Sequence, residues 1–414
     1  MDKISVNVSD SVYGSKHNAC NSLHTISLHN GVVFLEGAQN EKHRFIASSV
    51  FFFTKVSFLY RYSFKNKYMK RNTLTVVCIL LIICMGMTGC KKKNAPVEVA
   101  KPKLTEEQMK TAKNIEINIL RYEQDLFNMD TKDMAAGFKA LYGKYPENIV
   151  ANGAWNNTEM LQSIKGFVSD PVIKEIYKDT EAKYSDLSDF KNQIIPALTL
   201  YLSHFPNDRT PDFCTLVSGI DFQMPSVFGY ENTIFICLDM YMGKDYKQYG
   251  QAGMPKYIAA RCEPKYMATD CFTKALVYKH LPDKTLVTLL DNMVDAGKKM
   301  LFTQTMFPTV ESQDILGYSK EQYQWATSHE SAVWHYLVEK NMVYDNTDNV
   351  IRRMIDETPF TRDFGNDSPG RIGVFIGFQI VQSYMKTHPG TTLKDLMKMT
   401  DSQKFLKDSG YKPK

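Results

Sequence analysis

The sequence predicts a helix-dominated α+β domain with a small sheet in its N-terminal half, preceded by an export signal. Three observations carry this prediction. Apolar residues recur at helical spacing over most of the chain beyond residue 256, two runs rich in β-branched and aromatic residues lie between residues 213 and 239, and a short apolar stretch ends at a cysteine near residue 90. A few early strands followed by a mostly helical remainder are typical of the α+β class.

Residues 69–89 have the features of a bacterial lipoprotein signal peptide. The segment begins with the basic Met69-Lys70-Arg71, continues with an apolar run too short to span a bilayer comfortably, and ends with small residues directly before Cys90. We therefore expect acylation of Cys90 and anchoring of the mature chain to a membrane. The alternatives are an uncleaved anchor and a buried apolar segment.

Residues 1–68 precede this signal, show no clean periodicity and carry four of the nine histidines, so we interpret them as a spurious extension from a misassigned start codon or as a disordered leader. Residues 1–89 hold 10 of the 50 Lys/Arg and 4 of the 45 Asp/Glu, which leaves 40 basic and 41 acidic residues and a net charge of about −1. The basic balance of the whole chain therefore belongs to the leader. Nothing in the mature chain argues for nucleic acid as a partner.

Residues 90–105 are polar and contain proline, and they are typical of a tether. Residues 106–414 show no low-complexity break, repeat or second linker, which predicts one globular domain of about 300 residues. Alternating isoleucines predict a short strand at 115–119, and two further strands are expected at 213–220 and 233–239. Helices are expected at 131–142, 158–167, 171–178, 186–203, 265–280, 284–303, 319–340, 348–357, 370–387 and 392–399.

The helix expected at 284–303 has one apolar face, which predicts that it lies in the core. In the helix expected at 370–387, Gly373 and Gly377 are four residues apart and leave one face without side chains. This spacing predicts that another helix approaches closely there.

Four cysteines follow Cys90, and none forms a C-x-x-C motif. In an oxidising envelope compartment they are compatible with two disulfides, and free buried thiols are the alternative. The possible pairs are Cys214 with Cys237 and Cys262 with Cys271.

Catalytic motifs are scarce. His329-Glu330 is followed at the fourth position by Val333, and His335 lies at the sixth, on a different helical face, so this is not a zinc-binding H-E-x-x-H helix. No nucleophile elbow, P-loop or dinucleotide-binding glycine pattern occurs. We expect no bound metal and no cofactor.

Two stretches, together with Asp270 between them in the sequence, are candidates for a cleft. Asp239 and Tyr241 follow the last predicted strand beside a glycine turn, where clefts often form, although an ordinary packed turn explains them equally well. Arg371 lies near the start of a helix behind Pro369 and could pair with a carboxylate or hold a loop carbonyl, in a structural role or in a ligand cleft.

The chain resembles the gliding motility lipoprotein family GldB of Bacteroidetes over nearly its whole mature length. The order of the matching motifs is more specific than any one of them. Besides the segment before Cys90 they are Arg121-Tyr122-Glu123 with Asp125-Leu126-Phe127, residues 238–246, Thr288-Leu289-Leu290-Asp291, Met293-Val294, Gly297-Lys298, Gly317-Tyr318, Glu321-Gln322 with Trp325, and residues 368–373.

That family is in turn similar to predicted zinc-dependent peptidases, which implies a zincin-like (metallopeptidase-like) fold. In those enzymes a helix with H-E-x-x-H precedes a helix with a glutamate-glycine pair. By this resemblance the first motif falls near Asp270 to Lys274, where no histidine is present, and the ligand glutamate falls at Ala296. Alanine has no donor atom and a lysine ammonium repels a dication, so the resemblance implies a dismantled metal site and no enzyme activity.

The signal peptide and the resemblance together imply a periplasm-facing, catalytically inactive scaffold. The resemblance alone implies that its partners are envelope proteins linked to gliding or to type IX secretion. Two alternatives stay open. One is a metal-dependent hydrolase that rebuilt its chemistry with Asp270, Asp239 or His280. The other is an envelope lipoprotein that binds a peptide or a glycan.

Overall fold

The computed structural model describes residues 25–29, 32–36 and 104–413, and the chain divides into two compact units, residues 1–99 and 100–414. In the first unit, β1 (Thr25–His29) pairs antiparallel with β2 (Val32–Glu36). The predicted signal peptide, Cys90 and most of the predicted tether lie outside the described residues. Within the described residues, no helix combines the length and the apolar character that crossing a membrane requires.

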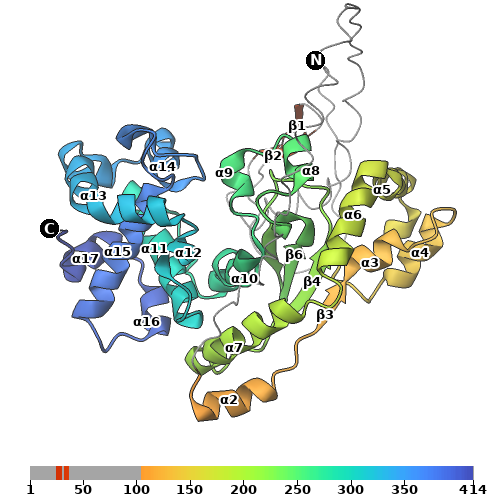
Figure 1. Ribbon diagram of the computed structural model, residues 1–414, viewed down its shortest axis with the longest axis horizontal. Helices are drawn as coiled ribbons and strands as arrows, with labels where there is room; N and C mark the ends of the chain where they lie inside the picture. Colours follow the sequence, from red (N-terminus) through yellow and green to blue (C-terminus); the bar gives the residue numbers. More distant parts are fainter. Residues whose placement is uncertain (1–24, 30–31, 37–103, 414) are drawn as a thin grey trace, which may run out of the picture. The chain divides into compact units, whose positions relative to one another are not determined.

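A four-stranded mixed sheet of order β3-β4-β6-β5 organises the second unit (Figure 1). The strands β3 (Ile119–Arg121), β4 (Asp212–Leu216) and β6 (Thr233–Cys237) run parallel, and β5 (Val227–Tyr230) pairs antiparallel with β6. The central strands β4 and β6 are almost entirely buried. Burial on both faces explains why they are continuous apolar runs rather than alternating ones.

Helices make up most of the rest of the second unit. Short 3-10 turns connect several of them, including η2 (Leu238–Tyr241), η4 (Leu276–Lys279), η5 (Met342–Tyr344) and η6 (Arg362–Phe364). In chain order the α-helices are α2 (Glu106–Lys113), α3 (Tyr122–Phe127), α4 (Met134–Leu141), α5 (Thr158–Ser169), α6 (Pro171–Lys183), α7 (Ser188–His204), α8 (Lys247–Gln251), α9 (Lys256–Ala259), α10 (Met267–Lys274), α11 (Leu289–Met306), α12 (Ser312–Leu316), α13 (Lys320–Glu339), α14 (Asp348–Ile355), α15 (Ile372–Thr387), α16 (Leu393–Lys398) and α17 (Ser402–Ser409).

Helices cover both faces of the sheet. Phe213 of β4 packs edge to face on Phe190 of α7, with ring centroids 5.3 Å apart. The next residue, Cys214, points to the opposite face because successive strand side chains alternate, and α3 contacts β4 there. Helix α10 contacts β5, β6 and α7. The helix that resemblance places at the peptidase zinc site therefore lies against the antiparallel edge of the sheet.

The helices α11 to α17 form a second group, shown in light to dark blue in Figure 1, with α11 and α15 in closest contact. A Cβ atom on Gly297 would lie 2.2 Å from the carbonyl oxygen of Gly377, and one on Gly377 would lie 1.8 Å from that of Met293. The predicted close helix approach is confirmed at Gly377. Gly373 serves a different neighbour, because a Cβ atom there would lie 2.8 Å from the carbonyl oxygen of Met354 in α14.

The central helix α11 begins later than its apolar pattern predicts. Thr288 and Asp291 form a capping box, in which the Thr288 side chain accepts from the Asp291 amide and Asp291 accepts from the Thr288 amide at 2.9 Å. This cap starts the helix at Leu289 rather than at residue 284. The strand β5 and the helices α2 and α17 were absent from the sequence-based prediction, since each is short and has no long apolar period.

All four described cysteines are buried free thiols, which is the alternative that the sequence left open beside the two possible disulfides. Cys214 pairs in register with Phe235, so Cys237 lies two residues further along the adjacent strand. That diagonal is about 8 Å between Cα atoms, beyond the reach of a disulfide. The Cys262 sulfur lies 3.9 Å from the Met254 sulfur.

Candidate functional site

The candidate site lies beyond the carboxyl ends of the parallel strands. Ligands of open α/β sheets bind at this edge, where the chain leaves the sheet and side chains from several strands meet. Here β4 runs on into the turn at Ser218, and β6 runs on through Asp239 to Tyr241. Asp239 and Tyr241, which were predicted to line a cleft, therefore lie at the edge of the sheet where ligands of such folds bind.

Asp239 is fully buried and holds the turn after β4. Its carboxylate accepts hydrogen bonds from the backbone amides of Ser218 at 2.9 Å and Ile220 at 2.7 Å, and from the Ser218 hydroxyl at 2.9 Å. Burial raises the pKa of Asp239, and these hydrogen bonds oppose that rise. The turn contains two residues with positive φ, Gly219 and Ile220. The carboxylate thus stabilises a strained turn and does not face a ligand.

Tyr241 and Asp270, also predicted for the cleft, are brought together by the fold. The Tyr241 hydroxyl donates to Asp270 Oδ2 at 2.7 Å and lies 3.1 Å from Ser226 Oγ. Lys274, one helical turn after Asp270, donates to the same Oδ2 at 2.8 Å and to Ser226 Oγ at 3.0 Å. Arg261 approaches the other oxygen, Oδ1, at 3.5 Å. We call these five residues the Asp270 network.

In the Asp270 network one carboxylate faces two cations, Lys274 and Arg261. Burial alone would raise the pKa of Asp270, but the charges of Lys274 and Arg261 outweigh it, so the pKa lies below the ordinary value for aspartate. The Asp270 side chain is 4% exposed, whereas that of Lys274 is 37% exposed. A carboxylate that is buried, ionised and bound on both oxygens is a poor general base. The groups nearest the solvent are the Lys274 amine and the Ser226 hydroxyl.

Arg371, the fourth predicted residue, lies at the border of this network rather than inside it. It pairs through Nε with Glu357 at 3.2 Å, and its guanidinium donates to the Leu316 carbonyl oxygen. It precedes α15 with a φ of 56°. Burial raises the pKa of Glu357, and the charges of Arg371 and then Arg261 lower it below its ordinary value. Glu357 thereby links Arg371 electrostatically to Arg261.

Arg261 is held by a close contact with a glycine. A Cβ atom on Gly317 would lie 1.4 Å from Arg261 Nη1, and Gly317 has a φ of 70°. The guanidinium also lies 4.3 Å from the centre of the Tyr266 ring, a cation–π distance. Its Nη1 atom is buried without a hydrogen-bond partner. The Gly317-Tyr318 motif therefore has a physical role, since no other residue leaves room for this guanidinium.

A second buried pair joins the strand ends on the other side of β4. Arg121 binds Glu123 at 2.5 Å and Glu181 of α6 at 2.7 Å, and the Thr215 hydroxyl donates to Glu123 at 2.8 Å. Burial raises the pKa of the fully buried Glu123, and Arg121 opposes the rise. These contacts tie β3, β4 and α6 together, so the Arg121-Tyr122-Glu123 motif is structural.

No group of three or more His, Cys, Asp or Glu residues in the described part of the chain is arranged to hold a metal ion. At the positions that the peptidase resemblance marks, Asp270 and Lys274 pair with each other across one helical turn. Ala296 shares a face of α11 with Thr303, seven residues later, and the Thr303 hydroxyl lies 2.8 Å from that of Thr273 in α10. Ala296 therefore belongs to the face of α11 that turns toward α10.

Comparison with known protein families identifies the family to which the chain belongs. A model of the gliding motility protein GldB family matches residues 103–413, well over half of the sequence. The chain belongs to the GldB family. Comparisons with curated proteins and with solved structures give no significant match.

The GldB match covers both the sheet and the helical group, so the Asp270 network lies wholly within the family domain. Lys274, Arg261, Ser226 and Glu357 were not predicted. The spacing of Asp270 and Lys274, four apart on a helix, is a local signal that could have found one of them. The others come from separate segments, and only the fold brings them together.

His280, named in the rebuilt-hydrolase alternative, belongs to a different cluster. Its Nε2 lies 2.9 Å from the Tyr201 hydroxyl and 3.4 Å from Asp208, and its ring stacks on Phe205 at 3.7 Å. Burial lowers the pKa of His280, and the Asp208 charge opposes this. The histidine packs among aromatic rings behind α10.

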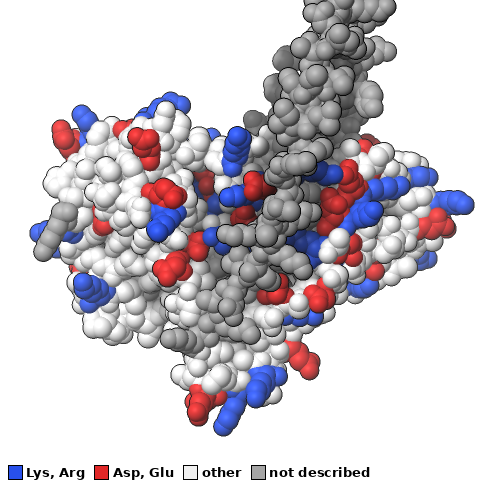
Figure 2. Space-filling view, viewed as in Figure 1, with Lys and Arg blue, Asp and Glu red and all other residues white. Residues whose placement is uncertain are grey.

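On the face seen in Figure 2, acidic and basic side chains are interspersed, without a broad area of one sign.

Proposed function

We propose that this GldB-family chain is a lipid-anchored envelope protein that serves as a non-catalytic scaffold for gliding motility or type IX secretion machinery. The family name associates the chain with gliding motility, and the small residues before Cys90 have the form of an acylation site. Anchoring through Cys90 would place the domain at the periplasmic side of a membrane, behind a tether that ends at the N-cap Thr105.

One observation supports the non-catalytic part of this proposal, namely the burial and charge pairing of Asp270. Its Oδ2 accepts from Tyr241 and Lys274, and Arg261 lies 3.5 Å from its Oδ1, so both oxygens face a donor or a cation of the protein. If the domain descends from a zincin-like peptidase, an ion pair has replaced two metal ligands, and Ala296 has replaced the third. An internal ion pair needs no metal to balance the charge of the carboxylate.

The enzymatic alternative makes a distinct prediction. We expect the full chain, purified in detergent with and without added zinc, to release no peptides from casein above background, and a chelator to change nothing. About one equivalent of tightly bound zinc, together with chelator-sensitive hydrolysis that disappears in Asp270→Asn, would establish the rebuilt hydrolase instead. The matched control is Glu175→Gln, whose carboxylate pairs at the surface with Lys247.

The anchoring and partner parts are tested in cells. We expect an alkyne-palmitate label on the wild-type chain and none on Cys90→Ser. Affinity capture of the tagged wild-type chain from crosslinked membranes should enrich envelope proteins of the motility or secretion machinery, whereas Cys90→Ser should lose them. Recovery of only abundant unrelated proteins by both chains would remove the support for a machinery role.

A further inference from the structure

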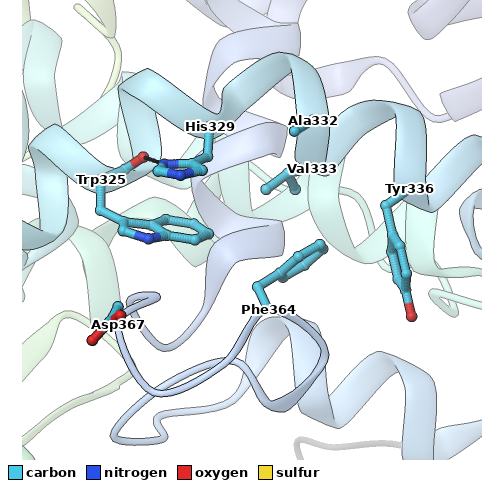
Figure 3. A pocket seen from close by; sticks show the side chains of 7 residues that line it. All are labelled: Trp325, His329, Ala332, Val333, Tyr336, Phe364 and Asp367. Carbon is cyan, nitrogen blue, oxygen red and sulfur yellow. Dashed lines mark hydrogen bonds between the residues drawn. The ribbon is translucent and has the colours of Figure 1, made fainter.

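An aromatic hollow lies in the helical group, and none of its lining residues belongs to the Asp270 network. It is a shallow space of about 380 Å³ lined chiefly by Trp325, His329, Val333, Tyr336, Phe364 and Asp367, which we call the aromatic hollow (Figure 3). The first four belong to α13 and the last two to the segment that begins at η6. The proposed scaffold role does not explain why aromatic rings line a surface space.

The spacing along α13 creates one wall of the hollow. Positions 325, 329, 333 and 336 follow one another at intervals of four, four and three, so their side chains lie on one helical face. Val333 is buried and forms the base of this wall, while Trp325 and Tyr336 are partly exposed. Phe364 closes the opposite side, with its ring centre 5.1 Å from that of Tyr336 and 6.4 Å from that of Trp325.

His329 fixes the orientation of the tryptophan. Its ring stacks on the indole of Trp325 at 4.2 Å and an interplanar angle of 10°. Its Nδ1 donates to the Trp325 carbonyl oxygen at 2.8 Å, one helical turn back. One indole face is therefore covered. Figure 3 shows the carboxylate of Asp367 on the side of the indole opposite His329.

The electrostatics of these walls select the sign of a ligand. Aromatic faces are negative and attract cations, and tryptophan does so most strongly. Asp367 adds a full negative charge at the rim, and no lysine or arginine lines the hollow. An anion would be repelled by both features. An uncharged sugar would gain contact with the ring and could donate hydrogen bonds to the carboxylate, but it would gain no charge attraction from either.

We propose that the aromatic hollow binds the cationic end of a lysine or arginine side chain presented by a partner protein. The charged group would lie against the free face of Trp325 and within reach of Asp367, with Phe364 limiting it on one side. The identity of the partner as an envelope protein rests on the proposed scaffold role. The binding of a cation does not rest on that role, because the same hollow would bind a cation if the protein were an enzyme.

The test follows the three tryptophans of the full chain by ¹⁹F NMR after incorporation of 5-fluorotryptophan, with signals assigned by Trp→Phe variants. The probes are N-acetyl-lysine amide and N-acetyl-arginine amide. N-acetyl-glutamine amide is the uncharged match, and chitotriose represents glycans. We expect only the two cationic probes to shift the Trp325 signal in a saturable way, and 0.5 M salt to weaken the effect.

Two variants define the contacts. Asp367→Asn should weaken binding of the cationic probes about fivefold, as expected for loss of one partly exposed charge interaction. Trp325→Ala should abolish it. The control Trp334→Phe should leave it unchanged, because Trp334 packs on Tyr411 outside the hollow, with ring centres 5.2 Å apart.

Each other outcome overturns the proposal in a distinct way. Equal shifts with the glutamine amide would show that charge does not matter, and a shift with chitotriose alone would assign the hollow to a glycan. A Trp325 signal that moves when Lys91, Lys92 and Lys93 are replaced by serine would identify the chain's own tether as the occupant. No shift with any probe would show that the hollow binds nothing of this class. These results leave the casein assay unaffected, so the two proposals fail separately.

Discussion

The contact between α11 and α15 makes the sharpest stability prediction. A Cβ atom added at Gly377 would lie 1.8 Å from the Met293 carbonyl oxygen, 2.5 Å from its carbon and 3.0 Å from its Cα, all of them backbone atoms. An uncrowded contact needs about 3.5 Å, so the two helices would have to separate by on the order of 1.5 Å. Side-chain rotation cannot relieve this clash.

The expected magnitude is a balance of two effects. Alanine in place of a helical glycine stabilises by roughly 1 kcal/mol, whereas overpacking of a core typically destabilises by about 1–3 kcal/mol and sometimes more. Separation of the helices also weakens dispersion contacts along the rest of their interface. Because this clash is with backbone atoms at 1.8 Å and 2.5 Å, we place the overpacking cost above its typical range and expect Gly377→Ala to lower the free energy of unfolding by about 2–4 kcal/mol.

The assay is urea and thermal unfolding of the full chain, followed by circular dichroism at the helical band. For a domain of this size the loss corresponds to a fall in the melting temperature of roughly 4–8 °C. Gly166→Ala is the matched control, because Gly166 lies inside α5 and its added Cβ would meet nothing within 4 Å. It should be neutral or stabilise by up to about 1 kcal/mol. A Gly377→Ala protein as stable as the control would refute the close approach.

Three further outcomes follow from buried polar groups. Asp270→Asn should lower the free energy of unfolding by roughly 2–3 kcal/mol, because it leaves Arg261 and Lys274 without their partner. The pKa of Asp270 is depressed in the folded state, so the stability advantage of the wild type over this variant, measured by urea titration, should fade as the pH drops below about 4. Lys298 is 4% exposed, and burial lowers its pKa to about 8, so the folded state loses this buried charge at a lower pH than the unfolded state does. The free energy of unfolding of the wild type should therefore rise between about pH 8 and 10.5 relative to that of Lys298→Met. Equal dependence of the two free energies on pH would contradict this. Finally, iodoacetamide followed by mass spectrometry should leave the four free cysteines of the family domain unmodified in the native chain and alkylate them in urea without a reductant. These cysteines are Cys214, Cys237, Cys262 and Cys271. Protection that persists in urea would indicate disulfides.

The Asp270 network and the aromatic hollow suit different tasks. The network surrounds a carboxylate that is 4% exposed and paired with two cations, so its natural role is to join the segment after α9, the helix α10 and the strand end after β6. The hollow has exposed rings and an uncompensated carboxylate at its rim, which are features of a recognition surface. Both the Asp270 network and the aromatic hollow agree with the proposal of a non-catalytic scaffold that contacts other proteins through a separate surface.

Much of this architecture was predictable from local patterns. The helical periods identified most of the C-terminal helices, among them the helix expected at 319–340, which the Ser319 and Gln322 capping box starts at Lys320. The spacing of Gly373 and Gly377 predicted a close helix neighbour. Such signals succeed because a helix satisfies its backbone and its cap within a few residues of sequence.

Other features were decided by contacts between distant segments. Sequence placed Asp239 and Tyr241 together, yet one holds a turn and the other binds Asp270, because both lie in the 3-10 turn η2, where residues two apart point in different directions. It left the cysteines open, and the register of β4 against β6 separated Cys214 from Cys237.

Sequence by itself determined the class of the domain, most of its helices and its membership in a family, since these depend on periodic patterns and on motif order. Tertiary structure alone decided which charges neutralise one another at Asp270, which helix each glycine of α15 admits, and that Phe364 closes a hollow against Trp325. Those outcomes depend on the distances between side chains far apart in the sequence, and only packing sets such distances.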